Sequence, residues 1–136
     1  ESMKALLQLP LAAVDFAAAG GTNFAKLELL RDSEEKQLIY GQLANVGHNA
    51  VEMVSFVNQL IAELGDRVKC PAVIVSGGIQ NFLDGYYLIN KVKMPAIYGQ
   101  ASGFLKYAQD EYATLHTYIA AQIEGLELAQ AFLKVR

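Results

Sequence analysis

The strongest constraint on the fold is a short apolar run that leads directly into two glycines and then into a helix-like segment. The apolar run covers residues 72–75, the glycines are Gly77 and Gly78, and the helix-like segment covers residues 83–92. Glycines at the end of a strand let the backbone approach an anion, and the first turn of the next helix offers free N–H groups. The sequence therefore predicts a strand, an anion-binding loop and a helix in succession.

The same succession occurs along the rest of the chain, so we expect four strand-then-helix units. The predicted strands are residues 11–16, a less distinct one within 42–46, then 72–75 and 96–98. The predicted helices are residues 23–30, 49–64 and 83–92, followed by a long last helix with a break near Gln109 and Asp110. Alternating strands and helices predict an α/β fold with a parallel sheet and right-handed crossovers.

The number of units limits the architecture. A chain of 136 residues is long enough for one domain with its own core, so we expect residues 1–136 to form a single (β/α)4 unit. A closed eight-stranded barrel needs roughly 200 residues or more. An open four-stranded arc would leave two unpaired edges and an apolar inner face. The chain is therefore expected to self-associate or to pair with a missing half of its own protein.

Composition and charge narrow the class of protein. Eleven basic and 14 acidic residues are mixed along the chain, and no basic patch typical of nucleic-acid binding is present. No apolar run reaches the length of about 18 to 20 residues that a membrane-spanning helix needs. Cys70 is the single cysteine, so no internal disulfide can form, which fits a reducing compartment. We therefore expect a cytoplasmic protein that binds neither nucleic acid nor membranes.

Three glycine-containing loops are candidate binding sites. They are Gly20-Gly21-Thr22, Gly77-Gly78 and Gly99-Gln100-Ala101, each at the end of a predicted strand. Neighbouring loops of this kind hold phosphorylated ligands in many (β/α) barrels. An ordinary turn with Thr22 as helix N-cap explains the first loop equally well. The second loop is the most specific signal for an anion-binding site. The third is a weak signal by itself and supports such a site only because it follows one strand-helix unit after the second.

Other residues with reactive side chains give weaker signals. Asp15 lies within an apolar strand, where a buried carboxylate needs a partner, either a ligand or, more often, the backbone or a neighbouring side chain. His48 and His116 have no companion at metal-ligand spacing and are expected at the surface. Cys70 is expected to be structural. The tyrosines are expected to pack between layers, except Tyr98, which lies at the carboxyl end of a strand.

No catalytic residue and no metal ligand can be assigned from the sequence. There is no Ser-His-Asp or Cys-His arrangement, and no pair of carboxylates stands at an obvious catalytic spacing. The predicted site therefore consists of a ligand-holding surface without acid–base machinery.

Taken together, the three loops resemble those of type 2 isopentenyl-diphosphate isomerase, a flavin-dependent enzyme built on a TIM-type (β/α)8 barrel. The matching stretches are residues 14–25, 76–84 and 98–106. The first resembles the family's Asp-Val-Ala-Gly-x-Gly-Gly-Thr-Ser-Trp, and the second its Ser-Gly-Gly-Ile-Arg-Asn-Gly-x-Asp. Order and spacing agree across essentially the whole chain. The resemblance implies that residues 1–136 are the C-terminal half of such a barrel.

The resemblance also implies a cofactor and a reaction. Thr22 would contact FMN, Gly77 and Gly78 would hold its phosphate, and residues 99–101 would complete the phosphate site. The family interconverts isopentenyl and dimethylallyl diphosphate in isoprenoid biosynthesis, with Mg²⁺ and NADPH also used by the whole enzyme. Its catalytic glutamine and metal-binding glutamate belong to the N-terminal half. The chain is therefore expected to bind FMN without catalysing the reaction alone.

The sequence departs from the family pattern at several positions. Gln80 stands where the family has arginine, Phe82 stands where it has glycine, and residues 45–48 read Asn-Val-Gly-His instead of Asp-Trp-Gly-Ile. Two alternatives stay open. The chain could belong to another flavin or phosphosugar barrel with the same phosphate loops, or it could be a non-catalytic half-barrel that dimerises as a binding or structural unit.

Overall fold

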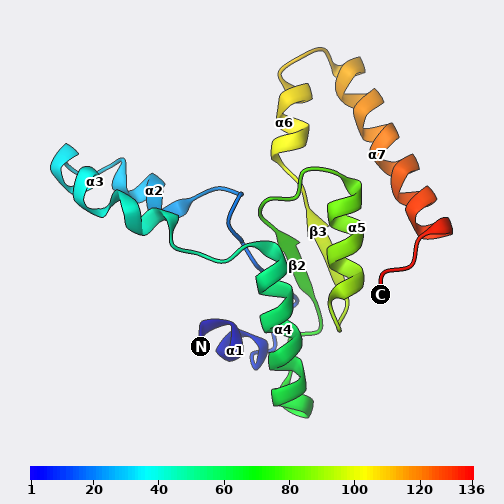
Figure 1. The fold of residues 1–136 in the computed structure, drawn as a ribbon, viewed down its shortest axis with the longest axis horizontal. Helices are drawn as coiled ribbons and strands as arrows, with labels where there is room; N and C mark the ends of the chain where they lie inside the picture. The colour runs from blue at the N-terminus through cyan, green and yellow to red at the C-terminus, as the bar shows by residue number, and fades with distance from the viewer.

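The computed structural model describes residues 1–136 and shows a three-stranded parallel sheet with helices packed against one face (Figure 1). The strands are β1 (Val14–Asp15), β2 (Val73–Ser76) and β3 (Ala96–Gly99). The helices are α1 (Ser2–Leu7), α2 (Phe24–Leu29), α3 (Glu34–Tyr40), α4 (Ala50–Leu64), α5 (Phe82–Lys91), α6 (Ser102–Ala108) and α7 (Tyr112–Phe132). Short 3₁₀ helices cover Gly41–Asn45 and Gly65–Arg67. The predicted α/β class with a parallel sheet is confirmed.

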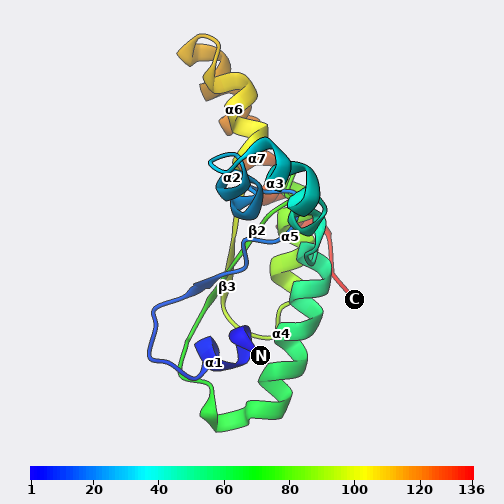
Figure 2. The ribbon, with the colours of Figure 1, turned by 90° about the vertical axis from the view of Figure 1, so that its left-hand side faces the viewer.

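The strands follow one another in the sheet in the order of the chain, β1-β2-β3. Val73 is the register partner of both Val14 and Ala96. Helix α4 lies between β1 and β2 in the chain and α5 lies between β2 and β3, and both pack on the same side of the sheet (Figure 2). The backbone pairing with β2 continues beyond the end of the short β1. The N–H groups of Phe16 and Ala18 donate to the carbonyls of Ile74 and Ser76, respectively.

The predicted strand within residues 42–46 is wrong. This segment forms the 3₁₀ helix Gly41–Asn45, which continues from α3, and β1 pairs directly with β2. Its side chains do not alternate between a buried and an exposed face, since Leu43 and Val46 are exposed and only Ala44 is buried. Together with α2 and α3 it forms an excursion that projects away from the sheet (Figure 1). Three strands, not four, are therefore present.

Helix α4 matches its predicted bounds because both of its ends are specified locally. Asn49 and Glu52 form a capping box in which each side chain accepts a hydrogen bond from the other's backbone N–H. The helix ends at Gly65, whose φ is +53°, a value that favours glycine. Between these ends Val54, Val57 and Leu64 fall at helical spacing and are buried.

The core lies between the helices and the covered face of the sheet. It includes Val14, Val73 and Val75 from the strands, with Val57 from α4 and Leu88 from α5. Cys70 is also buried and its thiol contacts the Ala72 carbonyl oxygen, as expected of a structural cysteine.

The opposite face of the sheet is not covered by any helix (Figure 2). In the register of the sheet Asp15, Ile74 and Ile97 lie side by side on this face, and Ile97 is 64% exposed. The arrangement differs from a doubly wound sheet, whose helices cover both faces.

The last helical segment is interrupted between Ala108 and Tyr112, where the sequence predicts a break. Within α7, Ala129 is buried, whereas Tyr112 and Ile123 are exposed. None of the helices combines the length and apolarity that crossing a membrane requires.

Candidate functional site

A cleft of about 740 Å³ lies at the carboxyl ends of the three strands. The loops after β1, β2 and β3 form its walls, as expected for a binding site in a parallel α/β fold. All six residues predicted as a cofactor site line it: Thr22, Gly77, Gly78, Gly99, Gln100 and Ala101. The structure therefore brings together three loops that are far apart in the sequence.

The first two glycine loops are packed backbone against backbone. Gly20, Gly77 and Gly78 all have positive φ values, of +97°, +92° and +75°. A Cβ atom at Gly77 would lie 2.0 Å from the Ala18 carbonyl oxygen, and one at Gly20 would lie 2.7 Å from the Gly78 Cα. Glycine is therefore required here by loop packing, independently of any ligand.

Several residues that line the cleft have backbone N–H groups without a partner in the chain. Those of Gly77, Gly78 and Ile79 on one loop, and of Gln100 and Ala101 on the next, donate to no other group of the chain. Consecutive unpaired N–H groups form an anion-binding concavity. The donor set of the cleft thus fits a phosphate group.

The first turn of α5 contributes less than the sequence predicts. The Asn81 side chain accepts hydrogen bonds from the N–H groups of Leu83 and Asp84, at 2.9 and 3.1 Å. The Gln80 N–H donates to the Asp84 carboxylate at 3.1 Å. Because these groups are already satisfied, the donors available to an anion come from the loop before the helix rather than from the helix itself.

No lysine or arginine lines the cleft, and its one charged residue is Asp15. Asp15 is exposed rather than buried, contrary to the sequence prediction. Its Oδ1 accepts hydrogen bonds from the Ala17 N–H, at 2.8 Å, and from the Ser76 hydroxyl. The predicted backbone and side-chain partners of the carboxylate are therefore both present.

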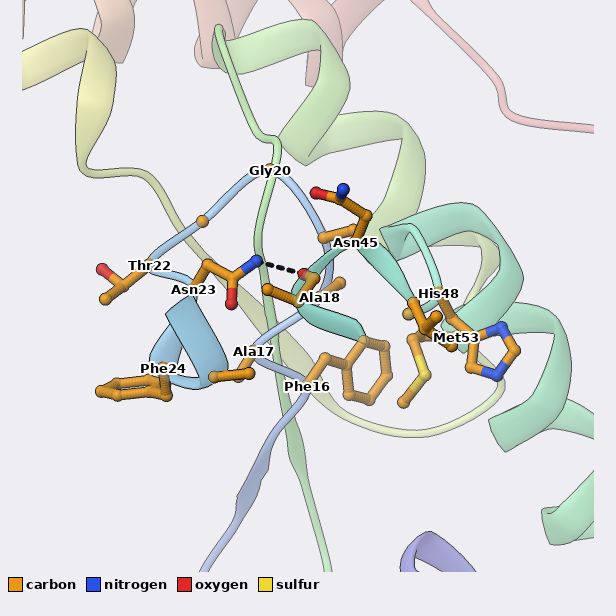
Figure 3. Close-up of a pocket in the computed structure, with 16 residues that line it drawn as sticks. Phe16, Ala17, Ala18, Gly20, Thr22, Asn23, Phe24, Asn45, His48 and Met53 are labelled. Atoms are coloured by element: carbon orange, nitrogen blue, oxygen red, sulfur yellow. Dashed lines mark hydrogen bonds between the residues drawn. The ribbon is translucent and has the colours of Figure 1, made fainter. Parts of the chain in front are cut away.

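Thr22 does not cap the helix that follows it. Asn23 is the N-cap of α2, since its Oδ1 accepts from the Lys26 N–H at 2.9 Å and its amide also donates to the Ala44 carbonyl (Figure 3). The Thr22 side chain is thus left available to the cleft. The alternative interpretation of Thr22 as an N-cap is wrong.

A second pocket, of about 480 Å³, lies on the other side of the first loop. Thr22 and Phe24 lie at one end of this pocket, and His48 and Met53 lie at the other (Figure 3). His48 is exposed, as predicted, and its ring contacts the ring of Phe56 edge-on. His116 is exposed as well. No group of three or more His, Cys, Asp or Glu side chains is placed to share a metal ion.

The Gln100 side chain joins the second and third loops. Its Nε2 donates to the Gln80 carbonyl oxygen at 2.7 Å and to the Tyr118 hydroxyl at 3.2 Å, while its Oε1 is buried without a partner. Gly103 leaves room for this contact, because a Cβ there would lie 2.6 Å from the Gln100 Nε2. The sequence does not predict the part that Gly103 and Tyr118 play in this contact.

Two residues singled out in the sequence lie away from the cleft. The Tyr98 ring packs against Gly85 on the covered side of the sheet, and burial raises the pKa of its hydroxyl, with Tyr118 adding to the shift. The Phe82 ring packs against Gly125 of α7. Tyr98 is therefore a packing residue, whereas the expected packing is wrong for Tyr87 and Tyr112, which are exposed. Phe82 does not replace a glycine inside the phosphate loop itself.

The chain matches no model of a known protein family, and no curated protein matches it.

Proposed function

We propose that this chain is the FMN-binding half of a flavin-dependent isopentenyl-diphosphate isomerase. One observation carries the proposal: the six residues matched to the family's FMN site line one cleft at the carboxyl ends of three parallel strands. The free N–H groups of that cleft supply the donors that a phosphate needs. Bound FMN, in its reduced form, would supply the acid–base group for the proton shift within the substrate that converts isopentenyl diphosphate to its isomer dimethylallyl diphosphate.

The architecture supports the proposal that the chain is the C-terminal half of a (β/α)8 barrel. The strands are parallel and in chain order, both crossover helices lie on one face, and the other face is uncovered. A barrel has this arrangement, because its helices are all outside and its inner strand faces pack against one another. The N-terminal half would supply the inner face that Ile97 lacks here.

The size and lining of the cleft also suit FMN. Its volume lies within the range of about 300–1,000 Å³ that is typical of small-molecule sites. Phe24 and Leu105 line it with exposed apolar side chains, next to the Thr22 hydroxyl. The loop N–H groups would hold the phosphate without help from a cation, since Gln80 replaces the family's arginine. We therefore expect weaker phosphate binding than a site with an arginine would give.

FMN titration into the purified chain, followed by flavin fluorescence, tests the proposal. We expect saturable binding with one FMN per chain and much weaker binding of riboflavin, which lacks the phosphate. Substituting Ala101→Asp places a carboxylate at the anion-binding loop and should weaken FMN binding at least tenfold. The matched control Ala120→Asp, on the exposed side of α7, should leave it unchanged.

Two results would contradict the proposal. One is a folded chain that takes up no FMN at millimolar concentration, and the other is FMN binding that Ala101→Asp does not change. If FMN binds, turnover of isopentenyl diphosphate under reducing conditions, after addition of an N-terminal barrel half, distinguishes the isomerase from another flavin barrel. The chain by itself should show no turnover.

A further inference from the structure

The cleft contains one negatively charged hydrogen-bond acceptor, the Asp15 carboxylate, beside loops whose N–H groups are donors. Asp15 lies on the uncovered face of the sheet, beside the carboxyl end of β2. Its Oδ1 accepts two hydrogen bonds from the chain, but its Oδ2 accepts none. No lysine, arginine or histidine forms an ion pair with it. Asp15 thus presents a charged acceptor oxygen without a partner in a cleft whose loops carry unpaired N–H donors.

The cleft is therefore chemically divided. The loop N–H groups of Gly77, Gly78 and Ala101 attract negative charge, whereas the Asp15 carboxylate repels it and can accept hydrogen bonds from O–H or N–H groups. A ligand that is anionic throughout, such as a diphosphate, would be repelled by Asp15. A ligand with one phosphate followed by hydroxyl groups satisfies both parts.

We propose that Asp15 is a ligand-orienting residue that accepts hydrogen bonds from the hydroxyl groups of a phosphorylated polyol. The inference rests on the proposed function, in which this polyol is the ribityl phosphate chain of FMN. Ser76 acts as a positioning residue. Its hydroxyl donates to Oδ1 of Asp15 and fixes the orientation of the carboxylate, so that Oδ2 is left for the ligand. The phosphate then lies at the glycine loops and the hydroxyl groups lie toward the sheet.

A purely structural role for Asp15 is the competing explanation. Its Oδ1 also holds the Ala17 N–H, and Ala17 has a strained φ of +45° at the start of the first loop. Loss of this contact would disturb the loop and would weaken every ligand alike. An orienting role instead predicts that ligands with and without hydroxyl groups respond differently.

The variant Asp15→Asn separates the two roles. Asparagine keeps an oxygen for the Ala17 and Ser76 donors, and it replaces the free carboxylate oxygen with an amide that donates instead of accepting. Calorimetric titration of FMN into Asp15→Asn should show a loss of affinity of about ten- to hundredfold, as for other hydrogen bonds to charged groups. Inorganic phosphate should bind Asp15→Asn as well as the parent chain or better, because a nearby negative charge is removed.

Further arms of the experiment identify what has failed if the result differs. Equal losses for FMN and inorganic phosphate, or an unchanged FMN affinity, would overturn the orienting role of Asp15. If the parent chain binds ribose 5-phosphate but not FMN, and Asp15→Asn weakens that binding selectively, the inference holds and the flavin assignment fails. A parent chain that binds neither ligand overturns both. Ser76→Ala should lower FMN affinity less than Asp15→Asn while leaving phosphate binding unchanged.

Discussion

At the scale of single residues, the glycines of the candidate site satisfy two requirements. The backbone N–H groups of Gly77 and Gly78 have no partner in the chain, and the glycines allow the first two loops to pack backbone against backbone. The second requirement exists without any ligand, and it is the more demanding one at Gly77. A side chain there would need both a strained φ and space that the Ala18 backbone occupies.

We predict that Gly77→Ala destabilises the fold by about 2 kcal/mol or more, because neither loop backbone can move away without breaking its pairing with the sheet. Urea unfolding followed by circular dichroism measures the change. Gly41→Ala is the matched control: Gly41 has helical φ and no neighbour within 4 Å of a Cβ, so it should be neutral or slightly stabilising. Equal midpoints for the two variants would show that the loops are not interlocked.

The sequence is informative about residues whose partners lie nearby in the chain. The strand-glycine-helix pattern around Gly77 can be predicted because all three signals occur within about 20 residues. The contacts of Ser76 with Asp15 and of Gln100 with Tyr118 cannot, since they depend on strand register and on the path of α7. The prediction for Tyr98 fails for a related reason: a position at a strand end does not fix the face that the side chain occupies.

At the scale of elements, α7 packs on α5, and one of the contacts between them is the close approach of Gly125 to the Phe82 ring. Gly125 is buried within α7, and a Cβ there would lie 2.6 Å from the Phe82 ring. Phe82 is the N-terminal residue of α5, directly after the loop that lines the cleft. The contact therefore links the position of α7 to the start of α5, although Phe82 itself lies outside the cleft.

We predict that Gly125→Val loosens α7 because the added side chain displaces the Phe82 ring, at a cost of about 1–3 kcal/mol. Hydrogen exchange should show faster exchange in α7 than in β2. Ala120→Val, on the exposed side of the same helix, should change little. In a double-mutant cycle, Phe82→Ala should recover part of the loss, because it vacates the space that the introduced valine side chain needs. Strict additivity of the two changes would contradict the contact.

The excursion between β1 and α4 shows where element prediction fails. A strand within residues 42–46 is expected only because a fourth unit completes the pattern, although the segment has no period-two alternation. Neither α2 nor α3 contains a buried residue, so tertiary packing gives the segment little support. Helix α4, in contrast, has a capping box, an amphipathic face and a terminal glycine, and its predicted bounds are correct to within one residue.

At the scale of the whole molecule, the uncovered sheet face is the main unsatisfied feature of the structure. It carries Ile97 and Ile74 in register beside one another, while α4 and α5 pack on the other side. Such a face with open strand edges favours association with another chain. The association expected from the number of strand units therefore stays a prediction, and it now has a defined surface.

We predict that the chain self-associates at micromolar concentration through this face, and that Ile97→Glu shifts it toward monomer. A glutamate at this position would have to lose its hydration on association, whereas in the monomer it stays in water because Ile97 is 64% exposed. Sedimentation velocity across a concentration series measures the shift, and thermal unfolding of the monomer should be little changed. Val51→Glu, at an exposed position of α4, is the matched control and should associate like the parent chain. If the parent chain sediments as a monomer at every concentration, the predicted self-association is wrong. If Val51→Glu dissociates as completely as Ile97→Glu, the association does not depend specifically on the uncovered sheet face.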